Sequence, residues 1–146
     1  MEFRTSCLIN ILLAFIALIL YVIGSYKFYK NQKGYHLLIG IALLTDGITA
    51  FLASFKITPT VQIPHTTAVP WDSVLFKCHV VFSTIGIIGF LILFVYLSVR
   101  RNSNYNTGIR KWQFIFLLPV WVFGELIALL NASFKIFFGI RLFDLL

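Results

Sequence analysis

Residues 35–55 read YHLLIGIALLTDGITAFLASF, an apolar run of the length that one membrane-spanning helix needs. An acidic residue, Asp46, lies near the centre of this run. An ionisable group at hydrocarbon depth costs roughly 2.5 to 3.5 kcal/mol on insertion scales. The run therefore predicts a membrane helix, and Asp46 marks the part of it where function or helix packing is concentrated.

Three further runs of the same kind occupy most of the 146-residue chain. They cover residues 7–26, 74–99 and 112–134. With 60% hydrophobic and 12% charged residues, and a mean hydropathy of +0.93, the chain has too little polar surface to cover a soluble globule. The sequence predicts an all-α, polytopic membrane protein, a single domain built as a four-helix antiparallel transmembrane bundle. Pro119 predicts a kink in the fourth helix.

The distribution of basic residues predicts the orientation in the membrane. Seven Lys and Arg residues, with no acid among them, lie in the connections that follow the first and third runs: Lys27, Lys30, Lys33, Arg100, Arg101, Arg110 and Lys111. Since Lys and Arg are enriched in cytoplasmic loops, both connections should face the cytoplasm, and the proline-containing loop 57–73 and both termini should lie outside. We expect a multi-pass protein of a cell membrane, of the bacterial inner-membrane type. The net charge of +7 is thus a topology signal and predicts no nucleic-acid partner.

Small and polar residues predict which helix faces pack together, because membrane helices associate through such residues. Each run carries one stripe at helical spacing. The stripes are Asn10, Ala14, Ala17, Tyr21 and Gly24; Ala42, Asp46, Thr49, Ala50 and Ala53; His79, Ser83 and Gly86; and Trp121, Glu125, Ala128 and Ala132, with Gly124 and Asn131 beside the last.

Three ionisable residues should share one layer of the bundle. A rise of about 1.5 Å per residue places Asp46 roughly 16 Å and Glu125 roughly 20 Å from the cytoplasmic ends of their helices, and His79 roughly 8 Å from the outer end. Asp46 and Glu125 could share a proton or hold a cation. Alternatively, each acid could be neutral, or an interhelical hydrogen-bond partner for Thr49, Asn131 or Tyr21. Asn10 and Asn131 complete the predicted set of buried polar residues.

The histidines and cysteines are the candidate ligands of a cofactor. His79 is a candidate for haem or copper because Ser83 and Gly86 leave space on its face, for a macrocycle or for a close helix. Cys78 could add a thiolate for copper, could pair with Cys7 in a disulfide, or could simply be a small apolar side chain. His36 lies at the opposite rim, about 20 Å away, so it should not share a metal with His79. His65, in the outer loop, should be solvated.

A set of short motifs resembles a known family. They are His36, the outer loop, Phe76 with His79, the basic residues before Trp112, and residues 120–124 (VWVFG). In this order they resemble the YozB-like, or CtaM-like, family (domain of unknown function 420) over residues 7–135. The resemblance implies four membrane helices, an accessory role in the maturation of haem-copper oxidases, and His36 and His79 as candidate haem or metal contacts. Where the family tends to have another histidine, residues 104–107 read NYNT.

The sequence contains no CxxC, HExxH or phosphate-loop motif, so we expect no catalytic cycle. Our first interpretation is a small membrane accessory protein that assists a partner such as a respiratory oxidase and could bind haem or copper. The alternatives are a proton- or cation-handling bundle that uses Asp46 and Glu125, and a purely structural membrane subunit.

Overall fold

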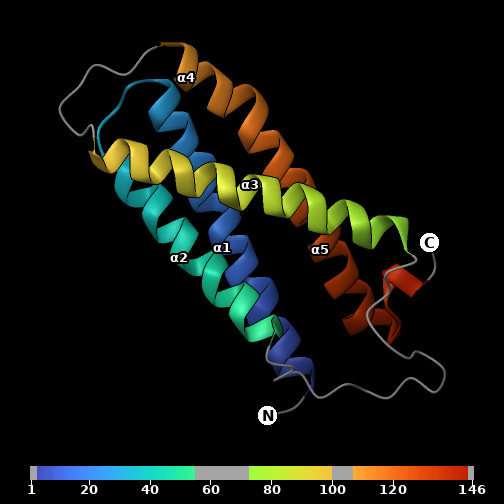
Figure 1. The fold of residues 1–146 in the computed structure, drawn as a ribbon. Helices are drawn as coiled ribbons and strands as arrows, with labels where there is room; N and C mark the ends of the chain where they lie inside the picture. The colour runs from blue at the N-terminus through green and yellow to red at the C-terminus, as the bar shows by residue number, and fades with distance from the viewer. Residues whose placement is uncertain (1–2, 55–72, 100–106, 145–146) are drawn as a thin grey trace.

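The fold is known from a computed structural model, which describes residues 3–54, 73–99 and 107–144 (Figure 1). These residues form helices and no strand. Four segments are long and apolar enough to cross a membrane, which confirms the predicted all-α four-helix architecture. The elements are α1 (Phe3–Tyr29), α2 (Tyr35–Ser54), α3 (Val74–Val99), α4 (Thr107–Trp112), the π-helical η1 (Gln113–Leu117), α5 (Leu118–Phe138) and the 3-10 turn η2 (Leu142–Asp144).

The first and fourth spans are longer than the predicted runs. The first helix continues to Tyr29, and the fourth span is continuous from Thr107 to Phe138. The prediction ended each run near its charged residues, but Lys27 and Lys135 lie in the last turns of their helices. A cation is favourable there, because the carbonyl end of a helix carries partial negative charge. The predicted outer loop falls almost entirely outside the described residues.

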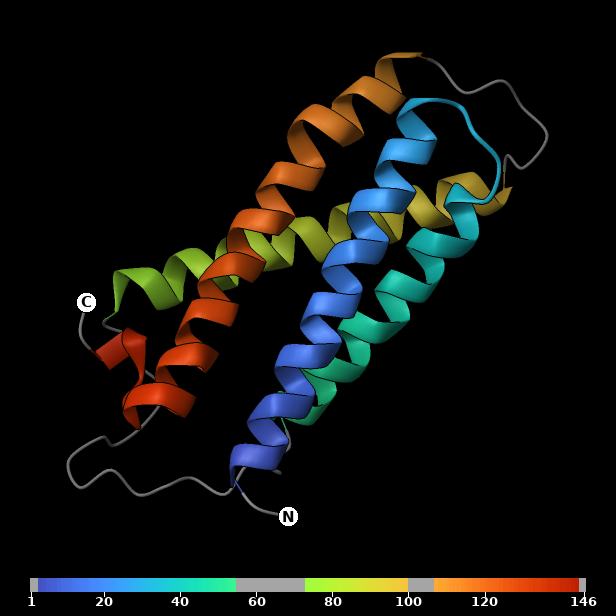
Figure 2. The ribbon, with the colours of Figure 1, turned by 180° about the vertical axis from the view of Figure 1, so that it is seen from behind.

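The helices are arranged as two pairs. Figures 1 and 2 show α1 and α2 running side by side as an antiparallel hairpin, with α3 crossing them obliquely and α5 beside α1 and α3. The turn between α1 and α2 uses left-handed backbone at Asn31 (φ 57°) and Gly34 (φ 87°). Because α3 is oblique, its first half packs on α5, whereas its last half reaches the start of α2.

Glycines allow the close approach of α3 and α5. A Cβ added at Gly86 would lie 2.5 Å from Cβ of Trp121, and one added at Gly124 would lie 2.7 Å from the backbone nitrogen of Ser83. Backbones that pack this closely leave no room for a side chain at either glycine. The predicted space at Gly86 is therefore filled by Trp121, so a neighbouring helix, and not a macrocycle, occupies it.

The half of the bundle near the α1–α2 turn has an apolar core. Its fully buried side chains come from all four spans and include Phe28, Ile39, Phe90, Leu97 and Leu117. The predicted stripes lie largely on the packed faces, since Ala14, Ala17, Gly24 and Ala42 are buried. Ala50, by contrast, is exposed, and the prediction for it was wrong.

A π-helical turn lies directly before Pro119. The backbone N–H of Leu118 donates to the carbonyl of Gln113, five residues back. Pro119 has no N–H, so it cannot supply the usual hydrogen bond to the carbonyl of Ile115, and the helix widens around the missing donor. The local disturbance expected at Pro119 thus takes the form of a π turn. Gln113 is fully buried, and its Nε2 donates to Ser25 Oγ at 2.5 Å.

Candidate functional site

Five buried or half-buried side chains from all four spans form a group in the middle of the bundle, which we call the central polar cluster. Its members are Tyr21 from α1, Asp46 from α2, His79 from α3, and Trp121 and Glu125 from α5. The sequence predicted that Asp46, Glu125 and His79 share a layer, and Asp46 lies in electrostatic range of both Glu125 and His79.

Asp46 is the best-supported acceptor in the cluster. The indole N–H of Trp121 donates to Asp46 Oδ2 at 3.1 Å, and the carboxyl group is only 7% exposed. The Tyr21 hydroxyl lies close enough to interact with the same carboxyl group, but it is buried without a hydrogen bond of regular geometry. Trp121 lies on the predicted stripe of α5, yet the sequence pointed to Thr49, Asn131 or Tyr21 as the partner. Thr49 instead donates to the carbonyl of Thr45.

Glu125 is the second buried carboxyl group. It is 7% exposed, one helical turn beyond Trp121, and within electrostatic range of Asp46. No Lys or Arg of the described residues forms an ion pair with either carboxyl group, and no described side chain donates a hydrogen bond to Glu125. The two acids therefore face each other in the low dielectric of the bundle without a compensating cation from this part of the chain.

His79 is fixed by the backbone of α5. Its Nδ1 lies 2.9 Å from the carbonyl oxygen of Gly124 and 3.1 Å from Ser83 Oγ. A carbonyl only accepts, so Nδ1 carries the hydrogen and the lone pair of the neutral ring lies on Nε2. The carbonyl group of Gly124 therefore orients this ring. His79 is half-buried and within electrostatic range of Asp46.

The chain beyond α5 covers the outer side of His79. Gly139, in left-handed conformation (φ 69°), ends α5 and lets the chain turn back. The backbone N–H of Phe143 donates to Asn131 Oδ1 at 3.4 Å, and its ring packs on those of Phe76 and His79, with centroids 5.3 and 6.1 Å away. Phe143 is 8% exposed. This turn had no signal in the sequence beyond Gly139, because its contacts join distant helices.

An aromatic layer closes the other side of the cluster. The ring of Tyr21 lies 4.4 Å from that of Phe90 and 4.2 Å from that of Trp121, and all three side chains are fully buried. The apolar core that contains Phe28 and Leu97 follows toward the α1–α2 turn. The cluster therefore lies between a thick layer of packed apolar side chains on the predicted cytoplasmic side and the thinner cover formed by Phe143.

Other predicted residues lie away from the cluster. His36 Nε2 lies 2.8 Å from Ser98 Oγ, and the ring stacks on Phe94. Ser98 is 19 residues from His79 on the same helix, or roughly 28 Å. His36 and His79 therefore cannot share one metal. Asn10 is half-buried, whereas the prediction had it buried, and Asn131 is buried against the backbone of Phe143.

The described residues contain no group of three or more His, Cys, Asp and Glu side chains that could hold a metal ion. Cys78 is a half-buried free thiol next to His79, but consecutive residues of a helix point about 100° apart. Ligation by His79 and Cys78 stays a prediction. The side chain of Cys7 and the whole of His65 lie outside what the structure describes.

The fold and the cluster define a class, a small multi-pass membrane protein with a buried carboxyl pair. Comparison with known proteins adds no relative, since no protein-family model, no curated protein and no solved structure matches the chain. The resemblance to the YozB-like family therefore stays a prediction.

Proposed function

We propose that this protein binds and releases a proton at the carboxyl pair of Asp46 and Glu125. The observation that carries the proposal is that two acidic side chains, each 7% exposed, lie in electrostatic range of each other, and no Lys or Arg of the described residues forms an ion pair with either of them. In a medium of low dielectric, two such groups hold one proton between them, because both cannot be charged at reasonable cost.

The donors around the pair support a proton on Glu125. The N–H of Trp121 can only donate, so it favours Asp46 as the charged acceptor, and the nearby hydroxyl of Tyr21 acts in the same direction. Glu125 receives no hydrogen bond from the described residues, so its charged form has no such support. Asp46 is thus the fixed anion, and Glu125 is the group that gains and loses the proton.

The surroundings favour exchange on one side of the membrane. The Tyr21–Phe90–Trp121 layer and the apolar core block the side of the α1–α2 turn, whereas His79 interacts electrostatically with Asp46 and packs against Phe143. The Nε2 of His79 has no hydrogen-bond partner among the described residues. This nitrogen can carry a proton between the outer surface and Glu125, while Nδ1 stays bonded to Gly124.

Difference infrared spectroscopy of the protein in lipid, recorded across a pH titration, tests the proposal. We expect the carbonyl stretch of a protonated carboxylic acid in the wild type, its loss in Glu125→Gln and its retention in Asp46→Asn. Glu2→Gln, far from the cluster in sequence, is the matched control and should leave the band unchanged. A wild-type protein without this band over the whole pH range would overturn the proposal. Proton flux into proteoliposomes then separates a conducting bundle from one that only stores a proton.

A second candidate is an accessory role in the assembly of a respiratory haem-copper oxidase. It is favoured by the geometry of His79, because a ligating histidine commonly donates its other ring N–H to a backbone carbonyl, as Nδ1 does to Gly124. The described residues supply this one imidazole and no second ligand on the same face. A single imidazole suits transient binding of haem or copper, whose other ligands would come from a partner protein.

Visible spectra and metal analysis of the purified protein test this candidate. His79→Ala should abolish any chromophore or metal that co-purifies, and His36→Ala should leave it intact. Retention in His79→Ala with loss in His36→Ala would move the contact to the other end of the bundle. A colourless, metal-free wild type that also fails to co-purify with an oxidase would rule out the accessory role. If the same protein shows the carboxylic-acid band in the infrared spectrum, the proton proposal would still hold.

A further inference from the structure

A groove lies on the outer surface of the bundle, away from the central polar cluster. It encloses about 260 Å³ between α3 and the start of the fourth span. Ile85, Ile88 and Ile92 of α3 form one wall, and Trp112, Phe116 and Leu117 form the other. Gly89 lies on its floor, where a side chain would collide with Leu117. The groove is thus lined mainly by apolar side chains, at a point where Gly89 lets α3 pack closely against Leu117.

The groove faces the hydrocarbon of the bilayer. Ile85, Ile88, Ile92 and Phe116 are large apolar side chains, 47 to 64% exposed, on spans that are long and apolar enough to cross a membrane. An apolar depression at this depth admits no water, so its occupant is an acyl chain or another apolar helix.

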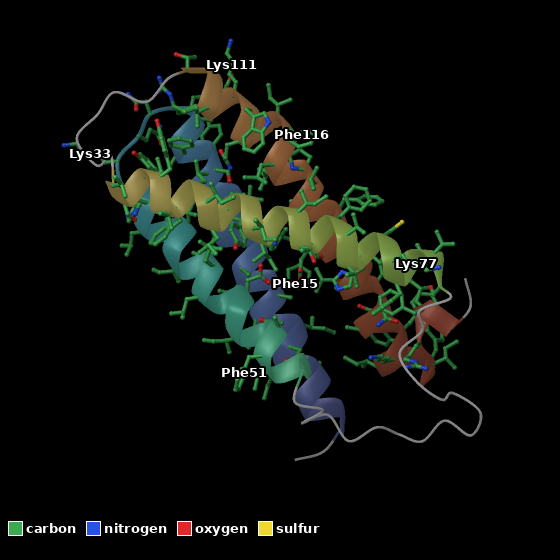
Figure 3. The ribbon with its side chains drawn as sticks, in the orientation of Figure 1. Phe15, Lys33, Phe51, Lys77, Lys111 and Phe116 are labelled. Atoms are coloured by element: carbon green, nitrogen blue, oxygen red, sulfur yellow. The ribbon has the colours of Figure 1, made fainter. Side chains whose placement is uncertain are left out.

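Two basic residues are sequence neighbours of Trp112, at one end of the groove. Arg110 and Lys111 immediately precede Trp112, in the last turn of α4. Arg110 is half-buried, and its Nε is buried without a hydrogen-bond partner among the described residues, whereas Lys111 is exposed. Figure 3 shows Lys111 at the end of the bundle and Phe116 further along the same span, toward the middle of the bundle. A guanidinium suits a phosphate group, and a half-exposed indole suits the headgroup level.

We propose that this groove is a binding site for one anionic phospholipid of the leaflet at the α1–α2 turn. One acyl chain lies along Ile92, Ile88 and Ile85, and the phosphate contacts Arg110 and Lys111. A phospholipid requires positive charge at one end of the groove only. A second copy of the chain would require apolar contact along the whole groove and no charged group at its rim.

Quenching of Trp112 fluorescence by brominated lipids tests the proposal. The protein is placed in vesicles that contain brominated phosphatidylglycerol or brominated phosphatidylcholine with the same chains, and Trp112→Phe identifies the signal of Trp112. We expect preferential quenching by the anionic lipid. Each positive charge near a surface contributes roughly fivefold to anionic-lipid binding, so Arg110→Gln with Lys111→Gln should lower the preference by at least fivefold.

The matched control removes the same charge on the same side, with Lys30→Gln and Lys33→Gln. It should leave the preference at Trp112 unchanged. Equal quenching by the two lipids in the wild type, or an equal loss in the control, would reduce the effect to general surface charge and overturn the site. Weak quenching by both lipids, together with cross-linking between copies at Ile88→Cys, would assign the groove to a second copy and also overturn it.

Discussion

Trp121 on α5 donates its indole N–H to Asp46 on α2, with 3.1 Å between Nε1 and Oδ2. These helices are not consecutive in the chain, so the bond connects the two helix pairs at the level of the central polar cluster. Both side chains are buried, and Trp121 also packs against Gly86. Asp46 thus has a structural partner in addition to its acidic neighbour Glu125, and the two roles can be separated by substitution.

Asp46→Asn should fold almost as well as the wild type, whereas Asp46→Leu should lose about 1 to 2 kcal/mol. The amide oxygen of Asn still accepts from Trp121, but Leu leaves the buried N–H without an acceptor. Asp46→Lys should be the worst, because it adds a buried ammonium group that costs several kcal/mol. Thermal melting and membrane yield measure all three. Equal behaviour of the three variants would mean that position 46 contacts water.

Trp121→Phe supplies the control for this series. It removes the donor while keeping most of the ring. If this hydrogen bond is formed, Asp46→Leu should destabilise the Trp121→Phe protein less than it destabilises the wild type. The reason is that Trp121→Phe has already removed the N–H that Asp46→Leu would leave without an acceptor. Additive costs in the double variant would contradict a direct bond between the two side chains.

Gly124→Ala should destabilise the bundle by roughly 1 to 3 kcal/mol, the usual cost of overpacking a filled site. The new methyl group would lie 2.6 Å from Ser83 Oγ, so α3 must move away from α5 and from the carbonyl that holds His79. Gly47→Ala is the matched control, since no atom lies within 4 Å of a Cβ there, and its melting temperature should stay level or rise slightly. A similar loss of stability in both variants would mean that the close approach of α3 and α5 is not the reason why Gly124→Ala destabilises the bundle.

Much of the fold could be predicted because the bilayer imposes it. About 20 apolar residues per span fix the number of helices, and small residues such as Gly24 and Gly124 mark the packed faces. The layer shared by Asp46, Glu125 and His79 could also be predicted, since depth along a helix depends only on residue count.

The contacts within that layer could not be predicted from the sequence. The donor to Asp46 depends on how far α5 is rotated, and a change of one residue would present another side chain. The π turn before Pro119 makes such a rotation, and Gln113 forms a buried hydrogen bond with Ser25 that the sequence analysis did not predict. A glutamine directly after an interfacial tryptophan and six residues before a proline was the only local signal for it.

The orientation of the bundle can be tested at two exposed lysines. Figure 3 shows Lys33 and Lys77 at opposite ends of the bundle. In a protein with Cys7→Ala and Cys78→Ala, Lys77→Cys should react with a membrane-impermeant maleimide from outside, and Lys33→Cys should react only after the membrane is opened. The reason is the surplus of Lys and Arg around Lys33. The reverse pattern would place both termini in the cytoplasm.

Phe143→Ala should expose His79. The ring of Phe143 is 8% exposed and stacks over the imidazole, 6.1 Å between centroids, so its removal opens the outer side of the central polar cluster. Modification of His79 by diethylpyrocarbonate, followed by peptide mass, should become faster, while the rate at His36 should not change. The stability cost should stay below the roughly 3 to 5 kcal/mol of a fully enclosed phenylalanine, because the turn lies at the edge of the bundle. Phe137→Ala, on a side chain that is 79% exposed, is the matched control and should alter neither rate. Equal rates at His79 in the wild type and in Phe143→Ala would show that the turn does not cover the histidine in solution, and access to Glu125 would then have to come from another direction.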